Sequence, residues 1–386
     1  MADELRALTR LTFDELGEAT GGIAQVHRAI ADRAFGPVGS GPPRALHDAI
    51  SGGVYAGIRR AAGLAGRAAG VAAAGRGRSL SVTPRGAAAL AVLNGLRGDA
   101  LEREGSDLAE PMCIRVGGRP VAPADFPDAG PRVVVFVHGL FETEYAWGSD
   151  SYGARLARDL DVTAVYVRFN SGRHISENGR SLSDLLDELV ADWPVPVERI
   201  ALVGHSMGGL VARSACHAGG DWTPRVRHTV SLGTPHTGTP VESAVHYAAA
   251  ALGVVGETRP FAGFLRRRSA GIRDLRSGSL VDEDWRDCDP EALRAAACRE
   301  VPLLDGAAHH FVAATITADP GHPFGRLVGD WLVLQPSASG RSRSRVVGFG
   351  DEAGAHVGGT HHLALLNHPA VYERLRDWLA RAPRRA

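Results

Sequence analysis

The sequence predicts an α/β protein in which helices cover both faces of a mostly parallel sheet. The apolar run at 132–137, Arg-Val-Val-Val-Phe-Val, is typical of a strand buried on both faces. From that run onwards strand-like and helix-like segments alternate, and such alternation produces parallel βαβ units. The third observation is the pentapeptide Gly-His-Ser-Met-Gly at 204–208, which follows an apolar run at 199–203 and precedes a helix-compatible segment.

Length and charge narrow the classes of protein that remain. A chain of 386 residues is long enough for one elaborated domain or two. The formal net charge is zero, so no global field recruits nucleic acid or an anionic membrane. The first residues, Met-Ala-Asp-Glu-Leu-Arg, lack the apolar core of a signal peptide, and no run approaches the roughly 20 apolar residues of a membrane span. We therefore expect a soluble cytoplasmic protein, with peripheral membrane contact as an open alternative.

Residues 1–110 are predicted to form a helical N-terminal segment. Apolar residues recur at helical spacing in 20–34 and 44–74, and a third helix is expected at 86–104. One interpretation is a hairpin of helices that binds a membrane surface or a partner. The other is a helical subdomain packed on the rest of the protein, which is the usual fate of an amphipathic helix.

Residues 111–386 are predicted to form the catalytic domain. A Gly-Gly turn at 117–118 between two short alternating stretches predicts a hairpin. A largely helical insertion at about 241–308 interrupts the alternation of strands and helices. Its position is that of a lid over the catalytic residues described below. Further strands are expected near 132–137, 162–168, 199–204, 226–232, 310–317 and 344–349, and helices near 150–160, 181–192, 207–218 and 369–381.

Ser206 is the predicted nucleophile. A serine in a sharp turn between a strand and a helix is held in a strained backbone conformation, and Gly204 and Gly208 remove the side chains that would collide there. The turn lifts the hydroxyl above the sheet edge at a helix N-terminus, where developing negative charge is favoured.

An oxyanion site is predicted beside this serine. The strand at 132–137 ends in His-Gly-Leu-Phe, a tight turn that can aim a backbone N–H at the oxygen of an attacked ester carbonyl. We assign the two donors to the N–H groups of Leu140 and of Met207, the residue directly after the nucleophile.

The acid and the base are expected downstream, in the order serine, acid, histidine. His362 is the preferred base and His361 its alternative, both in a glycine-rich loop before the last helix. Asp330, in Gly-Asp-Trp-Leu-Val, is the preferred acid, which would fix the imidazole tautomer. Asp319 and Asp305 are its competitors.

Neighbouring side chains are candidates for the walls of the substrate site. They lie in or after the oxyanion turn, beside the nucleophile, or in the Gly-Thr-Pro-His segment at 233–236. The apolar run at 244–255 would form either a channel for an acyl chain or part of the core. The candidates are His138, Phe141, Tyr145, His205 and His236.

Three motifs resemble the α/β-hydrolase superfamily, within it the bacterial lipase and GPI-inositol-deacylase-like branch. They are Val-His-Gly-Leu at 137–140, Gly-His-Ser-Met-Gly-Gly-Leu at 204–210 and Leu-Gly-Thr-Pro-His-Thr-Gly at 232–238. The resemblance covers about 110–382 and implies the fold, ester hydrolysis and the roles of Ser206, Asp330 and His362. Trp331 departs from the pattern, because many relatives carry a small residue there, and a bulky side chain at that position would narrow the surroundings of the acid.

The predicted function is therefore that of a serine carboxylic-ester hydrolase, an esterase or lipase that forms an acyl-enzyme on a small-molecule or lipid ester. This chemistry needs no cofactor, and the histidine and aspartate spacings match no metal motif. One alternative is an acyltransferase that passes the acyl group to an alcohol or amine. The other is a non-catalytic membrane- or partner-docking protein with a hydrolase fold. The sequence leaves the oligomeric state and the preferred acyl chain open.

Overall fold

The computed structural model describes residues 80–239, 268–289, 292, 297–342, 345–350 and 353–381. The chain divides into two compact units, and the larger comprises Ser81–Arg103, Ala109–Ser243 and Ser269–Ala386. The predicted helices at 20–34 and 44–74 and the apolar run at 244–255 lie outside the described residues. The division predicted at residue 110 stays a prediction, although the third helix of that segment belongs to the larger unit.

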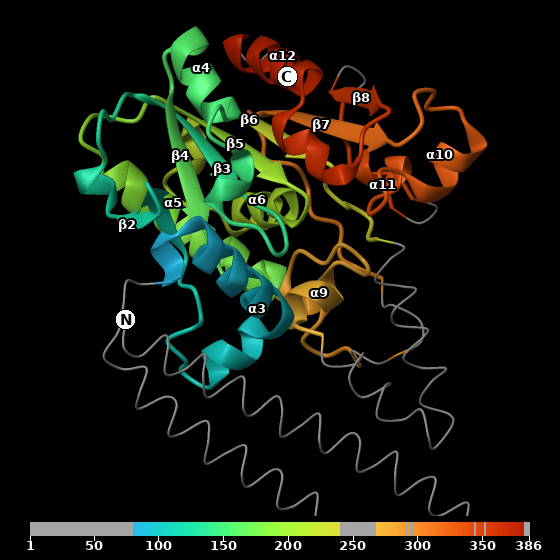
Figure 1. The fold of residues 1–386 in the computed structure, drawn as a ribbon, viewed down its shortest axis with the longest axis horizontal. Helices are drawn as coiled ribbons and strands as arrows, with labels where there is room; N and C mark the ends of the chain where they lie inside the picture. The colour runs from blue at the N-terminus through green and yellow to red at the C-terminus, as the bar shows by residue number, and fades with distance from the viewer. Residues whose placement is uncertain are drawn as a thin grey trace, which may run out of the picture. The chain divides into compact units, whose positions relative to one another are not determined.

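The described residues form one eight-stranded sheet in the order β2-β1-β4-β3-β5-β6-β7-β8 (Figure 1). β1 pairs antiparallel with β2 and with β4, and every other neighbouring pair is parallel. The expected α/β architecture is thus confirmed. The strands are β1 Cys113–Val116, β2 Arg119–Val121, β3 Arg132–Val137, β4 Thr163–Arg168, β5 Arg199–His205, β6 Val226–Leu232, β7 Ala308–Thr315 and β8 Gly354–Gly358.

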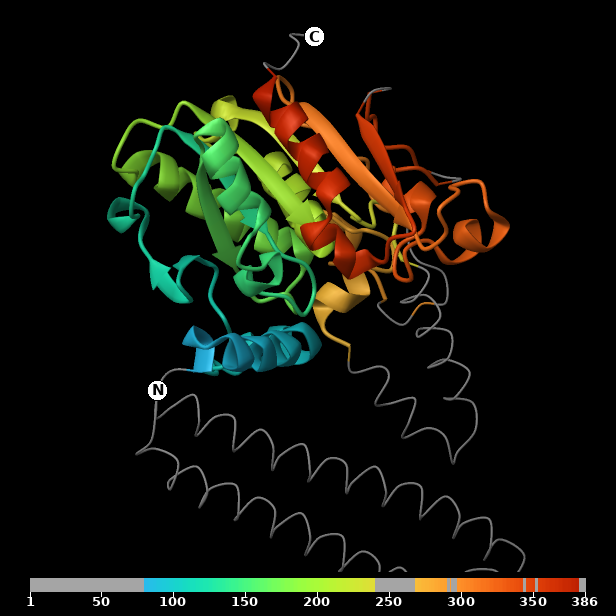
Figure 2. The ribbon, with the colours of Figure 1, turned by 45° about the horizontal axis from the view of Figure 1, so that its top comes forward.

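Helices cover both faces of the sheet, as Figures 1 and 2 show. The helices of the described residues are α3 Pro84–Arg103, α4 Tyr152–Leu160, α5 Ile175–Asp192, α6 Met207–Ala218, α9 Ala270–Asp274, α10 Pro323–Val328, α11 Gln335–Ala338 and α12 Pro369–Ala380. Short 3-10 helices are η2 Leu80–Val82, η3 Pro123–Asp125, η4 Glu144–Trp147, η5 Thr223–Arg225, η6 Asp282–Asp284 and η7 His362–Asn367. α5 begins six residues before the predicted start because His174 and Glu177 form a capping box there.

β3 lies between β4 and β5, and its continuous apolar sequence follows from burial on both faces. Val133, Val135 and Val137 pack on one side in the same cluster as residues of α5 and α6. Val134 and Phe136 pack on the other side in the cluster that contains residues of α4 and α12. Successive side chains of a strand point to opposite faces, so a strand covered on both sides must be apolar throughout.

The strand predicted at 344–349 is wrong. The last strand of the sheet is β8, which pairs parallel with β7, and the described residues 345–350 contribute only an isolated bridge between Val346 and Arg341. Val346, within the predicted range, is largely exposed. β8 is rich in glycine and forms because β7 pairs with it and the ring of Phe311 fills the space beside Gly354.

α3 packs on the loop that follows β4. The side-chain amide of Asn170 donates to the carbonyl oxygen of Gly98 at 2.9 Å. Gly172 leaves room for this approach, since a Cβ there would lie 2.1 Å from the carbonyl oxygen of Asn94. Of the insertion predicted at about 241–308, the described residues hold the short helices α9 and η6. No helix in the described part of the chain combines the length and apolar character needed to cross a membrane.

Gly208 is expected to tolerate no side chain. A Cβ there would lie 2.2 Å from the carbonyl oxygen of Val137 and 2.5 Å from that of His138, and both are backbone atoms that cannot rotate away. We expect Gly208→Ala to lower the free energy of unfolding by about 2–3 kcal/mol, as overpacking of a tight interior does. Urea unfolding measures the change.

Gly348→Ala is the matched control for this substitution, because a Cβ at Gly348 meets nothing within 4 Å. A Gly208→Ala variant that unfolds at the same urea concentration as Gly348→Ala would contradict the predicted contact.

Candidate active site

Ser206 lies in a strained turn between β5 and α6. Its backbone has φ 52° and ψ −122°, a region that residues other than glycine rarely adopt. The Ser206 N–H donates to the carbonyl oxygen of Leu232 at 2.8 Å, which fixes the turn to the end of β6. Gly204 permits the sharp reversal, because a Cβ there would lie 2.4 Å from the backbone nitrogen of Gly209. The side chain of Ser206 is partly exposed at the carboxyl edge of the sheet.

Asp330 and His362 meet in the interior, 32 residues apart in sequence. Nδ1 of His362 lies 2.7 Å from Oδ2 of Asp330, and the backbone N–H of His362 donates to the carbonyl oxygen of Asp330 at 2.9 Å. The other oxygen, Oδ1, accepts from the N–H groups of Leu332 and Val333 at 3.0 and 2.8 Å. The carboxylate is therefore held by three N–H groups, which fixes the imidazole ring in one orientation.

Nε2 of His362 is buried and has no hydrogen-bond partner among the described residues. The ring lies beside the nucleophile turn: a Cβ at Gly233 would be 3.1 Å from its Cε1, and Gly233 directly follows the Leu232 carbonyl that holds Ser206. A neutral imidazole whose Nδ1 donates to a carboxylate presents Nε2 as a free acceptor. The geometry thus leaves a proton acceptor next to the serine turn.

The competing residues lie elsewhere. His361, Asp319 and Asp305 are exposed, whereas Asp330 and His362 are 1% and 4% exposed. Trp331 does not narrow the surroundings of the acid, because it adopts φ 84° and is 57% exposed.

The turn after β3 lies next to Ser206. A Cβ at Gly139 would be 3.0 Å from Cβ of Ser206. The turn is held by the Gly139 N–H, which donates to Oε2 of Glu142 at 2.7 Å, and by the left-handed backbone of Phe141 at φ 64°. Within the described residues, no hydrogen bond uses the N–H of Leu140 or Met207. Both predicted oxyanion donors are thus available to a ligand.

His138 and His236 are fully buried, and their burial argues against the predicted contact with substrate. His138 stacks on Phe169 with ring centres 4.3 Å apart and accepts the Phe169 N–H on Nε2 at 3.2 Å. Burial lowers the pKa of His138 to about 4. Burial and the nearby guanidinium of Arg213 keep the pKa of His236 well below its ordinary value. Both rings are neutral parts of the interior.

His205 is also fully buried, which argues against its predicted contact with substrate. Its side chain contacts Glu142 instead. Nδ1 of His205 lies 2.9 Å from the Glu142 carboxylate, and Nε2 lies 3.3 Å from the carbonyl oxygen of His362. Burial alone lowers the pKa of His205, but the Glu142 carboxylate outweighs it and the pKa is raised. The contact between Glu142 and His205 was not predicted, since no local sequence pattern shows a partner 63 residues away.

Phe141 and Tyr145 lie between the oxyanion turn and α3. Phe141 is 38% exposed, and its ring fills the space beside Gly95, where a Cβ would lie 2.1 Å from Cδ1. The Tyr145 hydroxyl donates to the carbonyl oxygen of Val82 at 2.7 Å. The two aromatic residues thus fix the turn to the segment at the start of the larger unit.

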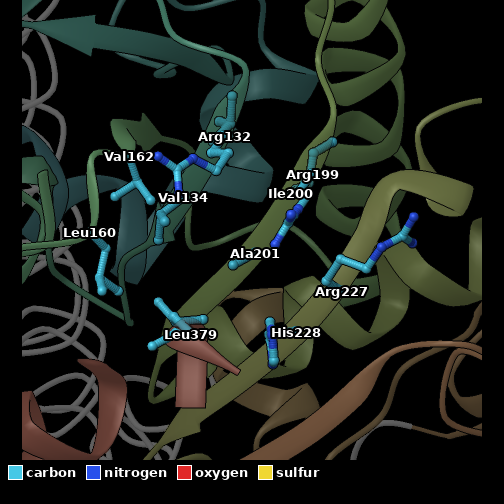
Figure 3. Close-up of a pocket in the computed structure, with 12 residues that line it drawn as sticks. Arg132, Val134, Leu160, Val162, Arg199, Ile200, Ala201, Arg227, His228 and Leu379 are labelled. Carbon is cyan, nitrogen blue, oxygen red and sulfur yellow. The ribbon is translucent and has the colours of Figure 1, made fainter. Parts of the chain in front are cut away.

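A cavity of about 160 Å³ lies at the opposite edge of the sheet (Figure 3). It is lined by residues at the amino ends of β3, β5 and β6, among them Arg132, Arg199 and Arg227. Ser206 follows the carboxyl end of β5, so this cavity is not part of the candidate active site. Among the described residues, no group of three or more His, Cys, Asp or Glu side chains is placed to hold a metal ion.

The order of these parts is that of the α/β-hydrolase fold. A turn that contains the unused N–H of Leu140 follows β3, a serine in a strained turn follows β5, an aspartate follows β7, and a histidine follows β8, all at the carboxyl edge of a mostly parallel sheet. The sequence model of the PGAP1-like alpha/beta domain family matches residues 129–251, which include both turns. The predicted resemblance to the α/β-hydrolase superfamily is thereby confirmed.

Solved structures of lipases and esterases are similar to the chain. The mature lipase BlEst2 of Bacillus licheniformis is 21% identical, with 69% of this chain and 99% of that chain covered and a TM-score of 0.42. EstA from Clostridium botulinum is 14% identical over 72% and 93% of the two chains, with a TM-score of 0.37. The esterase Pf2001 of Pyrococcus furiosus is 14% identical over 66% and 82%, with a TM-score of 0.38. Among curated proteins none matches.

Burial of neutral His138 makes stability depend on pH. Its pKa is about 4 in the folded protein and about 6.5 when solvated, so its contribution is complete above pH 6.5 and is lost as the pH falls towards 4. We expect the free energy of unfolding to lose roughly 3 kcal/mol from this group over that range. Urea unfolding of wild type and His138→Gln between pH 7.5 and 4 measures the difference in slope.

His361→Gln is the control, because it removes an exposed histidine in place of a buried one. Equal slopes for wild type and His138→Gln would show that His138 titrates normally in the folded protein.

Proposed function

We propose that this protein is a serine carboxylic-ester hydrolase in which Ser206 is the nucleophile, His362 the general base and Asp330 the orienting acid. The observation that carries the proposal is the buried contact of 2.7 Å between Nδ1 of His362 and Asp330, which leaves Nε2 unpartnered beside the strained serine turn. A neutral imidazole in this state is suited to accept a proton from a hydroxyl.

The proposed reaction proceeds in two halves. Nε2 of His362 takes the proton of Ser206 as Oγ attacks the ester carbonyl, and the N–H groups of Leu140 and Met207 stabilise the oxyanion. The bond to the alcohol breaks, the imidazolium returns the proton to the leaving oxygen, and an acyl-enzyme remains. Water then attacks the acyl carbonyl, His362 takes its proton, and the carboxylic acid leaves as Ser206 regains its hydrogen.

The electrostatics of the site support this sequence of steps. Asp330 accepts N–H groups on both oxygens, so it remains able to stabilise the imidazolium that forms on His362 without taking its proton. Met207 is the first residue of α6, and its N–H lies at the helix N-terminus, where the aligned peptide dipoles favour negative charge. Preorganised donors of this kind stabilise the transition state without rearrangement during the reaction.

Exposed apolar side chains in the chain segment around the acid, and directly after the base, favour a lipid-like or acyl ester as the substrate. Trp331 follows Asp330, and Leu363 follows His362. Single exposed apolar residues are ordinary, but a group of large ones beside a catalytic site is typical of contact with an apolar ligand. The exposed fractions are 48% for Phe324, 74% for Leu327, 57% for Trp331, 42% for Leu332 and 56% for Leu363.

The test of the proposed function is covalent labelling of the serine. We expect a fluorophosphonate probe to add one mass increment to wild type and none to Ser206→Ala, because only an activated hydroxyl attacks the phosphorus. Intact-protein mass spectrometry measures the adduct, and turnover of p-nitrophenyl esters from acetate to palmitate is followed in parallel. Wild type that neither takes up the probe nor cleaves any ester would favour the non-catalytic alternative.

The group of exposed apolar side chains predicts that the protein prefers esters with longer acyl chains. Leu327→Asp places a charge in that group, so the ratio of kcat/KM for p-nitrophenyl decanoate to that for the acetate should fall about tenfold, near 1.4 kcal/mol of lost apolar contact. Val92→Asp is the matched control, because Val92 is 48% exposed on α3. Equal ratios in Leu327→Asp and wild type would show that Leu327 does not contact the acyl chain of the substrate.

A further inference from the structure

Three backbone segments of the candidate site converge on one pair of buried side chains. The Glu142 carboxylate accepts the N–H of Gly139, in the oxyanion turn, at 2.7 Å. The same carboxylate contacts Nδ1 of His205, the residue directly before the nucleophile, at 2.9 Å. Nε2 of His205 contacts the carbonyl oxygen of His362, the proposed base, at 3.3 Å. The pair therefore connects the oxyanion turn, the nucleophile turn and the base loop in one chain of contacts.

Both nitrogens of His205 face acceptors, a carboxylate oxygen and a carbonyl oxygen. A neutral imidazole has one N–H and can satisfy one of them, whereas the imidazolium has two and satisfies both. His205 is fully buried and the Glu142 side chain is 10% exposed, so the ion pair is shielded from solvent. Hydrogen bonds between charged groups in such surroundings are short and directional, which makes them effective at fixing the separation of loops.

The rest of the packing leaves the ring little freedom. Trp147 meets His205 edge-on with ring centres 6.4 Å apart, and the ring of His362 lies 4.8 Å away at 45°. The charged groups that face His205 are Glu142 and, from the base side, Asp330, and both raise its pKa. The protonated form is therefore the one that the surroundings favour.

We propose that Glu142 and His205 are positioning residues that hold the oxyanion turn, the nucleophile turn and the base loop in register through a buried ion pair. The proposal rests on the proposed ester hydrolysis. Neither side chain is assigned a contact with the reacting atoms, since Glu142 acts through the backbone of Gly139, next to the oxyanion donor Leu140, and His205 acts through the backbone of His362. Its consequence is that loss of the pair misplaces the oxyanion donor of Leu140 and the ring of His362 relative to Ser206 while the three catalytic side chains remain present.

Kinetics of Glu142→Gln test the proposal. Glutamine keeps the shape and one acceptor oxygen but removes the charge that stabilises the imidazolium. We expect kcat for p-nitrophenyl butyrate to fall tenfold to a hundredfold, as misplacement of catalytic groups by about 1 Å does, while KM changes less than threefold. Rates are expressed per labelled serine after titration with the fluorophosphonate probe, so that unfolded protein is not counted. Glu188→Gln, an exposed position on α5, is the matched control.

The pH profile separates positioning from a merely structural role. Without the Glu142 charge, burial dominates and the pKa of His205 falls, so the ring loses its proton at lower pH. The alkaline limb of the kcat profile in Glu142→Gln should therefore move to lower pH relative to wild type. A variant that is destabilised but has a normal kcat per labelled serine and an unmoved alkaline limb would overturn the proposal.

Two further measurements keep the outcome clear. Histidine NMR of wild type, assigned by comparison with His205→Asn, should show a ring that stays doubly protonated above pH 6.5, and a neutral ring at pH 6.5 would also overturn the proposal. In Glu142→Gln/His205→Asn, the losses in kcat should be well short of additive, since both changes break one connection. Wild type that cleaves no ester would reject the proposed function instead, and the NMR result would then decide on the ion pair alone.

Discussion

The close approach of two backbones at Gly208 is the constraint on which the candidate site depends. The first turn of α6 lies against the carbonyl oxygens of Val137 and His138, at a distance that leaves no space for a Cβ. The serine turn and the oxyanion turn are therefore fixed to each other by direct backbone packing. Flexible side chains do not set that distance, so a small residue at 208 is a geometric requirement of the proposed chemistry.

Burial then determines which polar groups act and which only support. Asp330 keeps its carboxylate inside the protein because three N–H groups surround it. His138 and His236 lie in the same interior without an anionic partner, and burial keeps them neutral. His205 differs because Glu142 stands beside it. Buried histidines of one site thus have two different states, neutral where burial acts alone and protonated where a carboxylate lies alongside.

The sequence was sufficient for the parts of the fold that local patterns determine. β3 and the serine turn were predicted because their own residues carry the signal of buried strand and sharp reversal. The contact of Asp330 with His362 agreed with the expected chain order. β8 was missed because pairing with β7 overrides its glycine-rich composition. The burial of His138, His205 and His236 was missed for a related reason, since the groups that surround a side chain come from distant segments and leave no trace in the local sequence.

α3 has a consequence for where this protein can be divided. Arg168 at the end of β4 is buried, and its guanidinium bonds to the carbonyl oxygen of Ser81 at 2.7 Å and to the carboxylates of Glu110 and Glu144. Phe141 covers Gly95 in the same region. A fragment that starts at residue 110 lacks both the Ser81 carbonyl and the surface that supports the oxyanion turn. The smallest autonomous unit with this fold therefore begins ahead of α3, and the helix is an integral part of the architecture rather than an appendage to it.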